Sequence, residues 1–390
     1  MPDSAPLLVF ADDWGRHPSS CQHLVRHLLP WHDVVWVNTI MRPPRLNLAT
    51  MRRGWEKVRQ WRAGNSFAQA RSASPRVLNP RMWPWFSSPL DRRFNRWLLA
   101  RQLKPVIESL GELPIAVTTL PIVADLVGTL PVARWVYYCV DDFSVWPGLD
   151  GDALRFMEQQ LVREVDEVIA VSETLCAKLE PMGRASHFLS HGIDPEHWSA
   201  TTFLTEVPAV AALQRPLVVF WGVIDRRMDM TFIRRLVAEM SQGHVVLAGP
   251  LDNPDPDLLQ LPRVIHTGSL PFEQLPAMAR EASVLIMPYA DLPVTQAMQP
   301  LKLKEYLATG KPVVARDLPA NREWADCLDL AHDPQSFSEQ VRLRIRTGLP
   351  EDQSRSRHRL ASESWANKAK QFRHLVTSGI QTEAQLKAVG

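Results

Sequence analysis

The sequence has few cysteines and no long apolar run, and both shortages narrow the class of protein. Its four cysteines, Cys21, Cys139, Cys176 and Cys327, are far apart and form no CxxC or metal-binding spacing. We therefore expect reduced, mostly buried thiols in a cytoplasmic protein without a metal centre. No apolar run approaches the roughly 20 residues of a membrane span. The first residues lack the basic region and apolar core of a signal peptide, so none is expected.

Alternating strand and helix patterns predict an α/β protein. The 390 residues suffice for two domains of ordinary size, and 45% apolar with 22% charged residues is typical of globular chains. A strand at 7–11, a helix at 19–29 and a strand at 33–38 form a βαβ opening, whose first loop should lie at the carboxyl edge of a parallel sheet. Further strands are expected at 115–119, 134–140, 167–171, 186–191, 217–221, 244–249, 263–268 and 283–288.

Positive charge is concentrated near the start of the chain. Residues 1–110 hold 17 Lys and Arg against 7 Asp and Glu, a net charge of +10 within a total of +2, and eight of the 14 tryptophans. Basic, tryptophan-rich surface suits an anionic membrane face or a lipid-linked substrate. Residues 39–104, interrupted by prolines that include Pro89, are expected to form short pieces that build the acceptor and membrane surface. The alternative is that these are scattered solvated arginines and core tryptophans; no motif for nucleic-acid recognition accompanies the charge.

The strand at 134–140 delivers two carboxylates, Asp141 and Asp142, to the carboxyl edge of the predicted sheet. A deprotonated carboxylate there could take the proton from an acceptor hydroxyl as it attacks a sugar carbon. We predict that one of the two is such a base. The alternative is that one caps the following helix, because Asp is a preferred N-cap, and that the other is solvated.

A short helix at 300–309 followed by a buried strand at 312–315 is the most informative stretch. Pro300 suits a first helical position, and Gly310 suits a left-handed helix end. Lys302, in the first turn, would add a charge to the positive end of the helix dipole and so favour a phosphate. Glu305 could accept hydrogen bonds from a pair of ribose hydroxyls. The competing interpretation is that Lys302 and Glu305 form a weak surface ion pair.

These residues carry a resemblance to a known family. The run PLKLKEYLATGKPVVA is similar to the donor-binding segment of GT-B glycosyltransferases of family 4 and their bacterial polysaccharide relatives. In that family the lysine contacts the donor pyrophosphate and the glutamate contacts the ribose, roles that would fall on Lys302 and Glu305. Many members carry a second glutamate eight residues earlier, where this sequence has Ala297. That departure favours an inverting over a retaining mechanism.

The resemblance extends to other segments. YYCVDDF resembles a segment of teichuronic acid and xanthan glucuronosyltransferases, in which an aspartate is the proposed base; this would be Asp142 or Asp141. Either Arg226 or Arg227 would replace the usual arginine near the phosphates. The donor-side residues implied by the resemblance are Gly222, Arg226, Arg227, Gly268, Tyr289, Met298, Pro300 and Leu301, and the acceptor-side residues are Arg16, His17 and His191. Several of these, Tyr289 and Met298 among them, could instead be ordinary loop residues.

The resemblance implies a GT-B fold, in which two Rossmann-like domains face a central cleft and a C-terminal helix returns to the first domain. The expected parts are an acceptor domain at 1–194, a linker at 195–214, a nucleotide-sugar domain at 215–355 and the returning helix at 356–390. The implied function is transfer of a sugar from a nucleoside diphosphate sugar, UDP foremost, to a hydroxyl of a glycan, lipid-linked or small-molecule acceptor, without a metal or other cofactor. A non-catalytic sugar-nucleotide binder of an envelope polysaccharide assembly and a nucleotide-sugar 2-epimerase are the alternatives.

Overall fold

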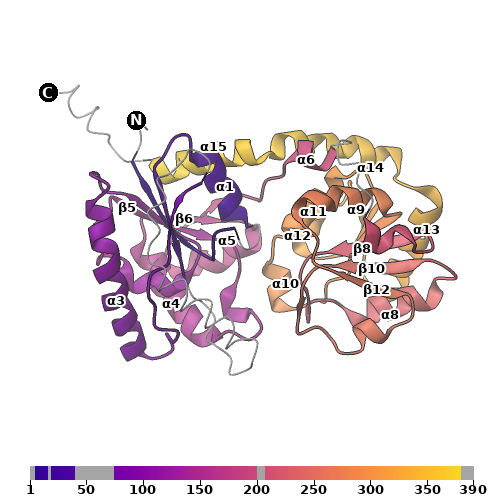
Figure 1. The fold of residues 1–390 in the computed structure, drawn as a ribbon, viewed down its shortest axis with the longest axis horizontal. Helices are drawn as coiled ribbons and strands as arrows, with labels where there is room; N and C mark the ends of the chain where they lie inside the picture. Colours follow the sequence, from indigo (N-terminus) through magenta and orange to yellow (C-terminus); the bar gives the residue numbers. More distant parts are fainter. Residues whose placement is uncertain (1–4, 16–18, 40–73, 200–206, 379–390) are drawn as a thin grey trace. The chain divides into compact units, whose positions relative to one another are not determined.

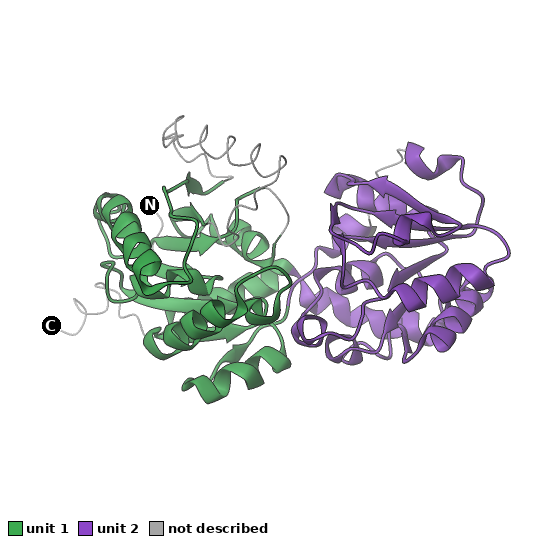
Figure 2. Ribbon diagram, turned by 90° about the horizontal axis from the view of Figure 1, so that it is seen from below, with its two compact units in different colours: residues 1–190, 365–390 green, residues 191–364 purple. Residues whose placement is uncertain are grey.

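The computed structural model describes residues 5–15, 19–39, 74–199 and 207–378. The chain divides into two compact units, each with its own parallel sheet. Unit 1 comprises Met1–Ser190 and Trp365–Gly390, and unit 2 comprises His191–Ser364 (Figure 2). The expected α/β fold with two Rossmann-like domains is thereby confirmed.

Unit 1 is built on a seven-stranded sheet in the order β3-β2-β1-β4-β5-β6-β7. The first strand, LLVFA, is buried along its whole length between two parallel neighbours, which explains its unbroken apolar sequence. The strands are β1 (Leu7–Ala11), β2 (Val34–Asn38), β3 (Arg76–Leu78), β4 (Ile115–Thr118), β5 (Arg134–Cys139), β6 (Glu167–Ala170) and β7 (His187–Phe188). The helices before the returning segment are α1 (Ser20–Leu28), α3 (Pro89–Glu108), η1 (Pro121–Leu126), η2 (Phe143–Val145), α4 (Gly151–Glu164), α5 (Glu173–Leu179) and η3 (Glu180–Met182).

The segment 74–108 differs from the prediction of short pieces broken by prolines. It contains the edge strand β3 and the 20-residue helix α3. Pro89 does not interrupt this helix but begins it, directly after the N-cap Ser88, whose hydroxyl accepts a hydrogen bond from the Asp91 amide. Proline is favoured there because the missing N–H would have no intrahelical partner. The prediction covered residues 39–104, and its part at 40–73 lies outside the described residues.

The C-terminal helix α15 (Trp365–Thr377) belongs to unit 1 and packs on α1 (Figure 1). The Trp365 ring stacks on His23 with centroids 4.7 Å apart, and Phe372 meets Tyr138 edge-on at 5.2 Å. The predicted return of the chain to the first domain is confirmed. Residues 357–363, expected in the same helix, instead form the separate 3-10 helix η6 (Arg357–Glu363) in unit 2.

Unit 2 is built on a six-stranded parallel sheet in the order β12-β10-β8-β13-β14-β15, with the separate pair β11-β9. Its strands are β8 (Leu217–Trp221), β9 (Ile224–Asp225), β10 (His244–Ala248), β11 (Leu251–Asp252), β12 (Val264–Gly268), β13 (Val284–Met287), β14 (Val313–Arg316) and β15 (Asp329–Ala331). Its helices are α6 (Pro195–Ser199), α7 (Pro208–Ala211), α8 (Met230–Glu239), η4 (Leu258–Gln260), η5 (Phe272–Gln274), α9 (Leu275–Glu281), α10 (Pro293–Ala297), α11 (Leu301–Ala308), α12 (Pro319–Arg322), α13 (Pro334–Thr347), α14 (Glu351–Ser356) and η6.

The described parts of the predicted linker at 195–214 lie in unit 2. They form α6 and α7, and Trp198, Val207 and Val210 are buried in the core of that unit. The stretch therefore does not form an extended connection of its own. The sequence of this stretch shows no periodic apolar pattern, but Trp198, Val207 and Val210 contribute to the core.

Candidate functional site

The helix α11 places Lys302 in its first turn. Pro300 is the N-cap, with extended backbone, and the helix begins at Leu301 rather than at Pro300. The other end follows the prediction, because Gly310 adopts φ +71°, a left-handed conformation that glycine adopts without strain. Leu303, Tyr306 and Leu307 bury the predicted apolar face. The position of Lys302 is thus set by the buried side of its own helix.

The Lys302 ammonium lies against two other segments of unit 2, the end of β8 with Gly222 and the loop after β13. Its Nζ donates a hydrogen bond to the Tyr289 hydroxyl at 2.6 Å and lies 4.2 Å from the centre of the Phe220 ring. It also lies so close to Gly222 that a Cβ there would collide with it, and Gly222 has φ +133°. The structure therefore brings together three predicted residues, Lys302, Tyr289 and Gly222, and shows why a side chain is excluded at 222.

Glu305 is only partly exposed and is held by Trp221. The indole Nε1 of Trp221 donates to the Glu305 carboxylate at 3.2 Å. Burial raises the pKa of Glu305 to about 7, although the Trp221 hydrogen bond and the Lys302 charge act in the opposite direction. Because Lys302 is bonded to Tyr289 and Glu305 to Trp221, the structure does not support the alternative of a simple surface ion pair.

Trp221 was not among the predicted site residues. It ends β8 immediately before Gly222, and its ring stacks on Trp198 at 5.5 Å and meets Tyr306 at 4.2 Å. The Tyr306 hydroxyl accepts a hydrogen bond from the Trp221 amide at 2.8 Å. This packing fixes the position of the indole N–H that donates the hydrogen bond to Glu305. The available sequence signal was its place at the end of a strand beside the predicted glycine turn.

The two arginines after Gly222 are placed differently. Arg226 is exposed, whereas Arg227 is buried and forms an ion pair with Asp225 at 2.8 Å. Arg227 also places a guanidinium nitrogen 3.5 Å from the Met298 sulfur and lies 5.8 Å from the centre of the Tyr289 ring. Of the predicted pair, it is therefore Arg227 that joins Tyr289 and Met298 in the same neighbourhood.

Glycines lie at the carboxyl ends of three adjacent strands: Gly222 follows β8, Gly249 follows β10, and Gly268 is the last residue of β12. The Gly249 amide donates to the Gly268 carbonyl at 2.8 Å, which ties the predicted Gly268 to the end of β10. A Cβ on Gly249 would collide with the Gly222 carbonyl, and Gly249 has φ +149°. Gly249 was missed by the sequence reasoning, although a glycine directly after a buried strand was the visible signal. At these three positions the ends of the strands carry no side chains, so that a ligand could approach the backbone closely.

The predicted base Asp142 in unit 1 is a helix cap. Its Oδ1 accepts hydrogen bonds from the Ser144 amide at 3.0 Å and hydroxyl at 2.6 Å, and pairs with the Lys178 ammonium at 2.7 Å. Burial by itself would raise the pKa of Asp142, but the Lys178 and Ser144 interactions outweigh it and lower the pKa. Asp142 is therefore ionised at neutral pH, as a base must be. Asp141, the other candidate, is partly exposed.

A buried carboxylate that the sequence reasoning missed lies behind Asp142. Glu158 on α4 pairs with Lys178 at 2.5 Å and accepts a hydrogen bond from the Tyr137 hydroxyl at 2.7 Å. Desolvation tends to lower the pKa of Lys178, but Glu158 and Asp142 together raise it. Lys178 thus joins two carboxylates that are 16 positions apart along the chain, from 142 to 158. No local pattern reveals such a contact.

The three predicted acceptor-side residues are not brought together by the described structure. Arg16 and His17 lie outside the described residues. His191 is buried in unit 2, not in the domain where it was expected, and its carbonyl accepts a hydrogen bond from Lys304 at 2.6 Å. Within the described ranges, no group of three or more His, Cys, Asp or Glu side chains could hold a metal ion.

Parts of the sequence are similar to known glycosyltransferases. Residues 215–345 match the family model described as "Glycosyl transferases group 1". Over 175 residues the chain is 29% identical to a Bacillus subtilis (strain 168) protein described as "Putative teichuronic acid biosynthesis glycosyltransferase TuaH". The match covers 43% of this chain and 44% of that relative, so the chain spans less than half the length of the curated relative.

Solved structures are similar over nearly the whole chain. Sucrose-phosphate synthase from Thermosynechococcus elongatus has a TM-score of 0.68 at 17% identity, covering 99% of this chain and 100% of that one. Anabaena Alr3699/HepE in complex with UDP and glucose has a TM-score of 0.68 at 13% identity, covering 96% and 100%. Two Rossmann-like units of this kind define the GT-B class. The match of residues 215–345 to the glycosyl transferases group 1 model agrees with this class, and the resemblance noted in the sequence is confirmed.

Proposed function

We propose that the protein is a glycosyltransferase that moves a sugar from a nucleoside diphosphate sugar, with UDP as the nucleotide, to a hydroxyl of a glycan, lipid-linked or small-molecule acceptor. The observation that carries the proposal is the cluster of Lys302, Tyr289 and Gly222 at the N-terminus of α11. A helix N-terminus with an ammonium and bare backbone beside it is suited to a diphosphate. The UDP complexes of Anabaena Alr3699/HepE, a structural neighbour, support the choice of UDP.

In this proposal Lys302 and the α11 dipole stabilise the negative charge that develops on the departing pyrophosphate. Arg227 adds positive potential but shares its charge with Asp225. The ionised Glu305 accepts hydrogen bonds from the ribose hydroxyls, with Trp221 holding it in place. These groups allow the leaving group to be stabilised without a metal ion, and we propose metal-independent transfer.

The acceptor hydroxyl needs a base, and we propose Asp142 or Asp141. Asp142 is ionised and held by Lys178 and Ser144, which fixes its orientation but weakens it as a proton acceptor. The absence of a glutamate at 297 supports an inverting transfer, in which the base activates the acceptor for direct attack on the anomeric carbon. We propose that the reaction takes place in the cytoplasm, where nucleotide sugars are available. We also propose that the protein contacts the cytoplasmic face of the membrane peripherally.

Substitution of the aspartates tests whether the protein turns over its donor or only binds it. The assay measures UDP released from a panel of UDP-sugars in the presence of a bacterial glycolipid and glycan extract. We expect Asp141→Asn or Asp142→Asn to reduce turnover by about 100-fold or more while UDP still stabilises the protein. If neither variant changes the rate, the base is misassigned. Binding of UDP without any release from UDP-sugars would favour a non-catalytic binder.

A further inference from the structure

Large apolar side chains are exposed in unit 1 along one side of α3, on the segment just before it and on α4. They form what we call the α3 aromatic face, with exposed fractions of 40% for Trp83, 45% for Trp85, 79% for Leu90, 44% for Phe94, 53% for Trp97 and 59% for Phe156. Trp83 lies 4.8 Å from Trp85 and 5.8 Å from Phe94, which lies 5.9 Å from Trp97, as measured between ring centres. Four of these rings therefore form one continuous cluster.

The helix spacing explains the arrangement. Leu90, Phe94 and Trp97 recur at steps of four and three residues and so share one side of α3. The opposite side buries residues such as Leu99 and Leu103 against the rest of unit 1. A surface helix of a globular protein normally has polar residues on its outer side. Here large apolar groups occupy part of it, which marks an interaction surface.

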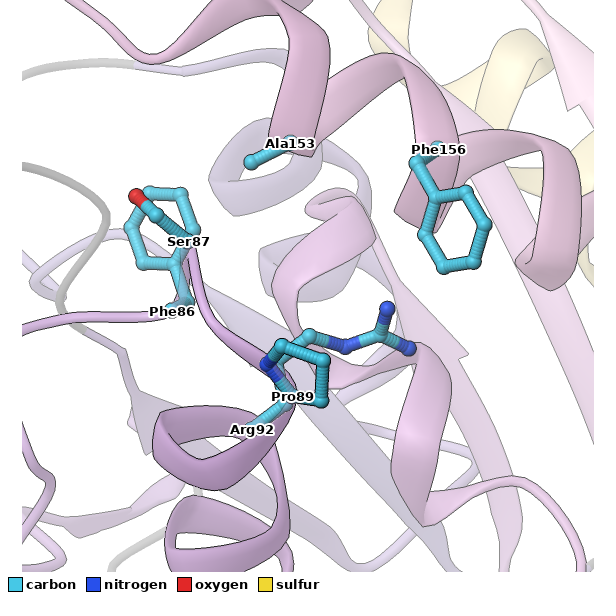
Figure 3. A pocket seen from close by; sticks show the side chains of 6 residues that line it. All are labelled: Phe86, Ser87, Pro89, Arg92, Ala153 and Phe156. Atoms are coloured by element: carbon cyan, nitrogen blue, oxygen red, sulfur yellow. The ribbon is translucent and has the colours of Figure 1, made fainter.

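A small pocket extends this surface from α3 to α4. Figure 3 shows Phe86 and Pro89 on one side of it, with Ala153 and Phe156 of α4 on the other. Its volume is about 140 Å³. Arg92 crosses toward α4, where its guanidinium lies 5.0 Å from the centre of the Phe156 ring and forms an ion pair with Asp125 at 2.6 Å. The contact between Arg92 and the Phe156 ring joins α3 to α4 at this surface.

The charges around the aromatic side chains are mainly positive. The helix α3 carries five basic and two acidic residues. Arg93, Arg96, Arg101 and Lys104 are all exposed, and the Arg101 guanidinium lies 5.6 Å from the centre of the Trp97 ring. One of the acidic residues, Asp91, is already bonded to the Trp83 indole at 2.8 Å. The surface thus presents tryptophan, phenylalanine and arginine together.

We propose that the α3 aromatic face binds an anionic lipid bilayer. Tryptophan rings are stable at the depth of the lipid headgroups, where the indole is partly apolar and its N–H remains hydrated. Arginines beside them meet the lipid phosphates, and each basic residue near an anionic surface strengthens binding. This proposal deepens the proposed function by naming the surface that would keep the enzyme beside lipid-linked acceptors. The α3 aromatic face contains no residue proposed for the donor site. The membrane proposal and the proposed function can therefore be tested separately.

The test measures sedimentation of the full-length protein with vesicles of phosphatidylcholine, alone or mixed with phosphatidylglycerol. We expect binding only to the mixed vesicles, reduced by added salt. Arg93→Gln with Arg96→Gln should weaken it about 30-fold, since each basic residue contributes about 1 kcal/mol. Phe94→Ala with Trp97→Ala should weaken it by at least about tenfold. The matched control is Arg346→Gln with Arg355→Gln, two exposed arginines of unit 2, which should change binding little.

Three results would overturn the proposal. One is the absence of binding to either vesicle, and another is binding that the α3 variants leave unchanged. The third is a dimer, or retention on a soluble glycan, that is lost in the Phe94→Ala/Trp97→Ala variant in place of vesicle binding. Stabilisation by UDP, measured on every variant, should be unchanged. If UDP stabilises the protein while vesicles do not bind, the membrane surface fails and the proposed function stands.

Discussion

Glu305 combines a hydrogen-bonding role with an unusual acidity. Its pKa of about 7, caused by burial, means that the carboxyl is partly protonated near neutral pH. A carboxylate accepts hydrogen bonds from two ribose hydroxyls, whereas the protonated form loses part of that capacity. Burial of Glu305 would therefore make the proposed nucleotide binding sensitive to pH.

We predict that the affinity for UDP-glucose rises between about pH 6 and about pH 8 as Glu305 ionises. In Glu305→Gln the affinity should be lower and nearly independent of pH over this range. The sign for stability is opposite: because the folded pKa is raised above the unfolded value, ligand-free stability contributed by Glu305 falls as pH rises toward about 7. Titration calorimetry at several pH values measures the affinity, and an equally steep profile in Glu305→Gln would contradict this role.

Lys178 is the residue that holds the Asp142 carboxylate. Lys178→Met removes the cation shared by Asp142 and the buried Glu158. The variant should lose about 2 kcal/mol of unfolding free energy at pH 7, because Glu158 keeps a buried charge without its counterion. Wild-type stability from the Asp142 pair should be lost as pH falls below the ordinary Asp range, because the pKa of Asp142 is lowered.

Urea unfolding measures this loss, with Lys178→Arg as the control that keeps the charge. The arginine variant should retain part of the stability. If Lys178→Met were as stable as the wild type across the pH range, the ion-pair network would contribute nothing to holding Asp142.

At the scale of elements, the turn between β8 and β9 and the start of α11 depend on each other through Gly222 and Lys302. Gly222→Ala should displace the Lys302 ammonium and strain the backbone at φ +133°. We expect a loss of about 1–3 kcal/mol in stability and loss of stabilisation by UDP. Gly310→Ala is the matched control: its φ of +71° imposes strain, but a Cβ there meets nothing within 4 Å.

Thermal unfolding with and without UDP separates these two effects. Both variants should unfold at a lower temperature, but only Gly222→Ala should fail to respond to UDP. A full response to UDP in Gly222→Ala would mean that the contact with Lys302 is unimportant for the nucleotide.

The helices and strands differ in how well they can be predicted from the sequence. Buried strands such as β1 and β8 are continuous apolar runs, and α11 has clear start and end signals, so both kinds were predicted closely. The helix α3 was missed because its exposed Leu90, Phe94 and Trp97 and its prolines obscure the period. The pairing of Trp221 with Glu305 joins residues 84 positions apart, and only the folded chain reveals such a contact.

The whole molecule consists of two units with separate sheets, and the proposed binding surfaces are divided between them. Unit 2 has a hydrophobic core of its own and contains every donor-site residue proposed above. Unit 1 contains the aspartates and the α3 aromatic face. A ligand that binds only the folded form of one unit stabilises that unit by mass action, by about 2.7 kcal/mol at 100 times its dissociation constant. Nucleotide binding should therefore stabilise unit 2 and leave the stability of unit 1 unchanged.

Scanning calorimetry with UDP, GDP, TDP and CDP tests directly whether unit 2 holds a nucleoside diphosphate at Lys302. For the wild type we predict that one nucleotide, UDP, raises the unfolding temperature of the unit 2 transition by several degrees. Lys302→Ala should abolish that shift while leaving the nucleotide-free unfolding temperature nearly unchanged. An absence of any shift, or an equal shift in Lys302→Ala, would show that Lys302 does not bind a nucleoside diphosphate.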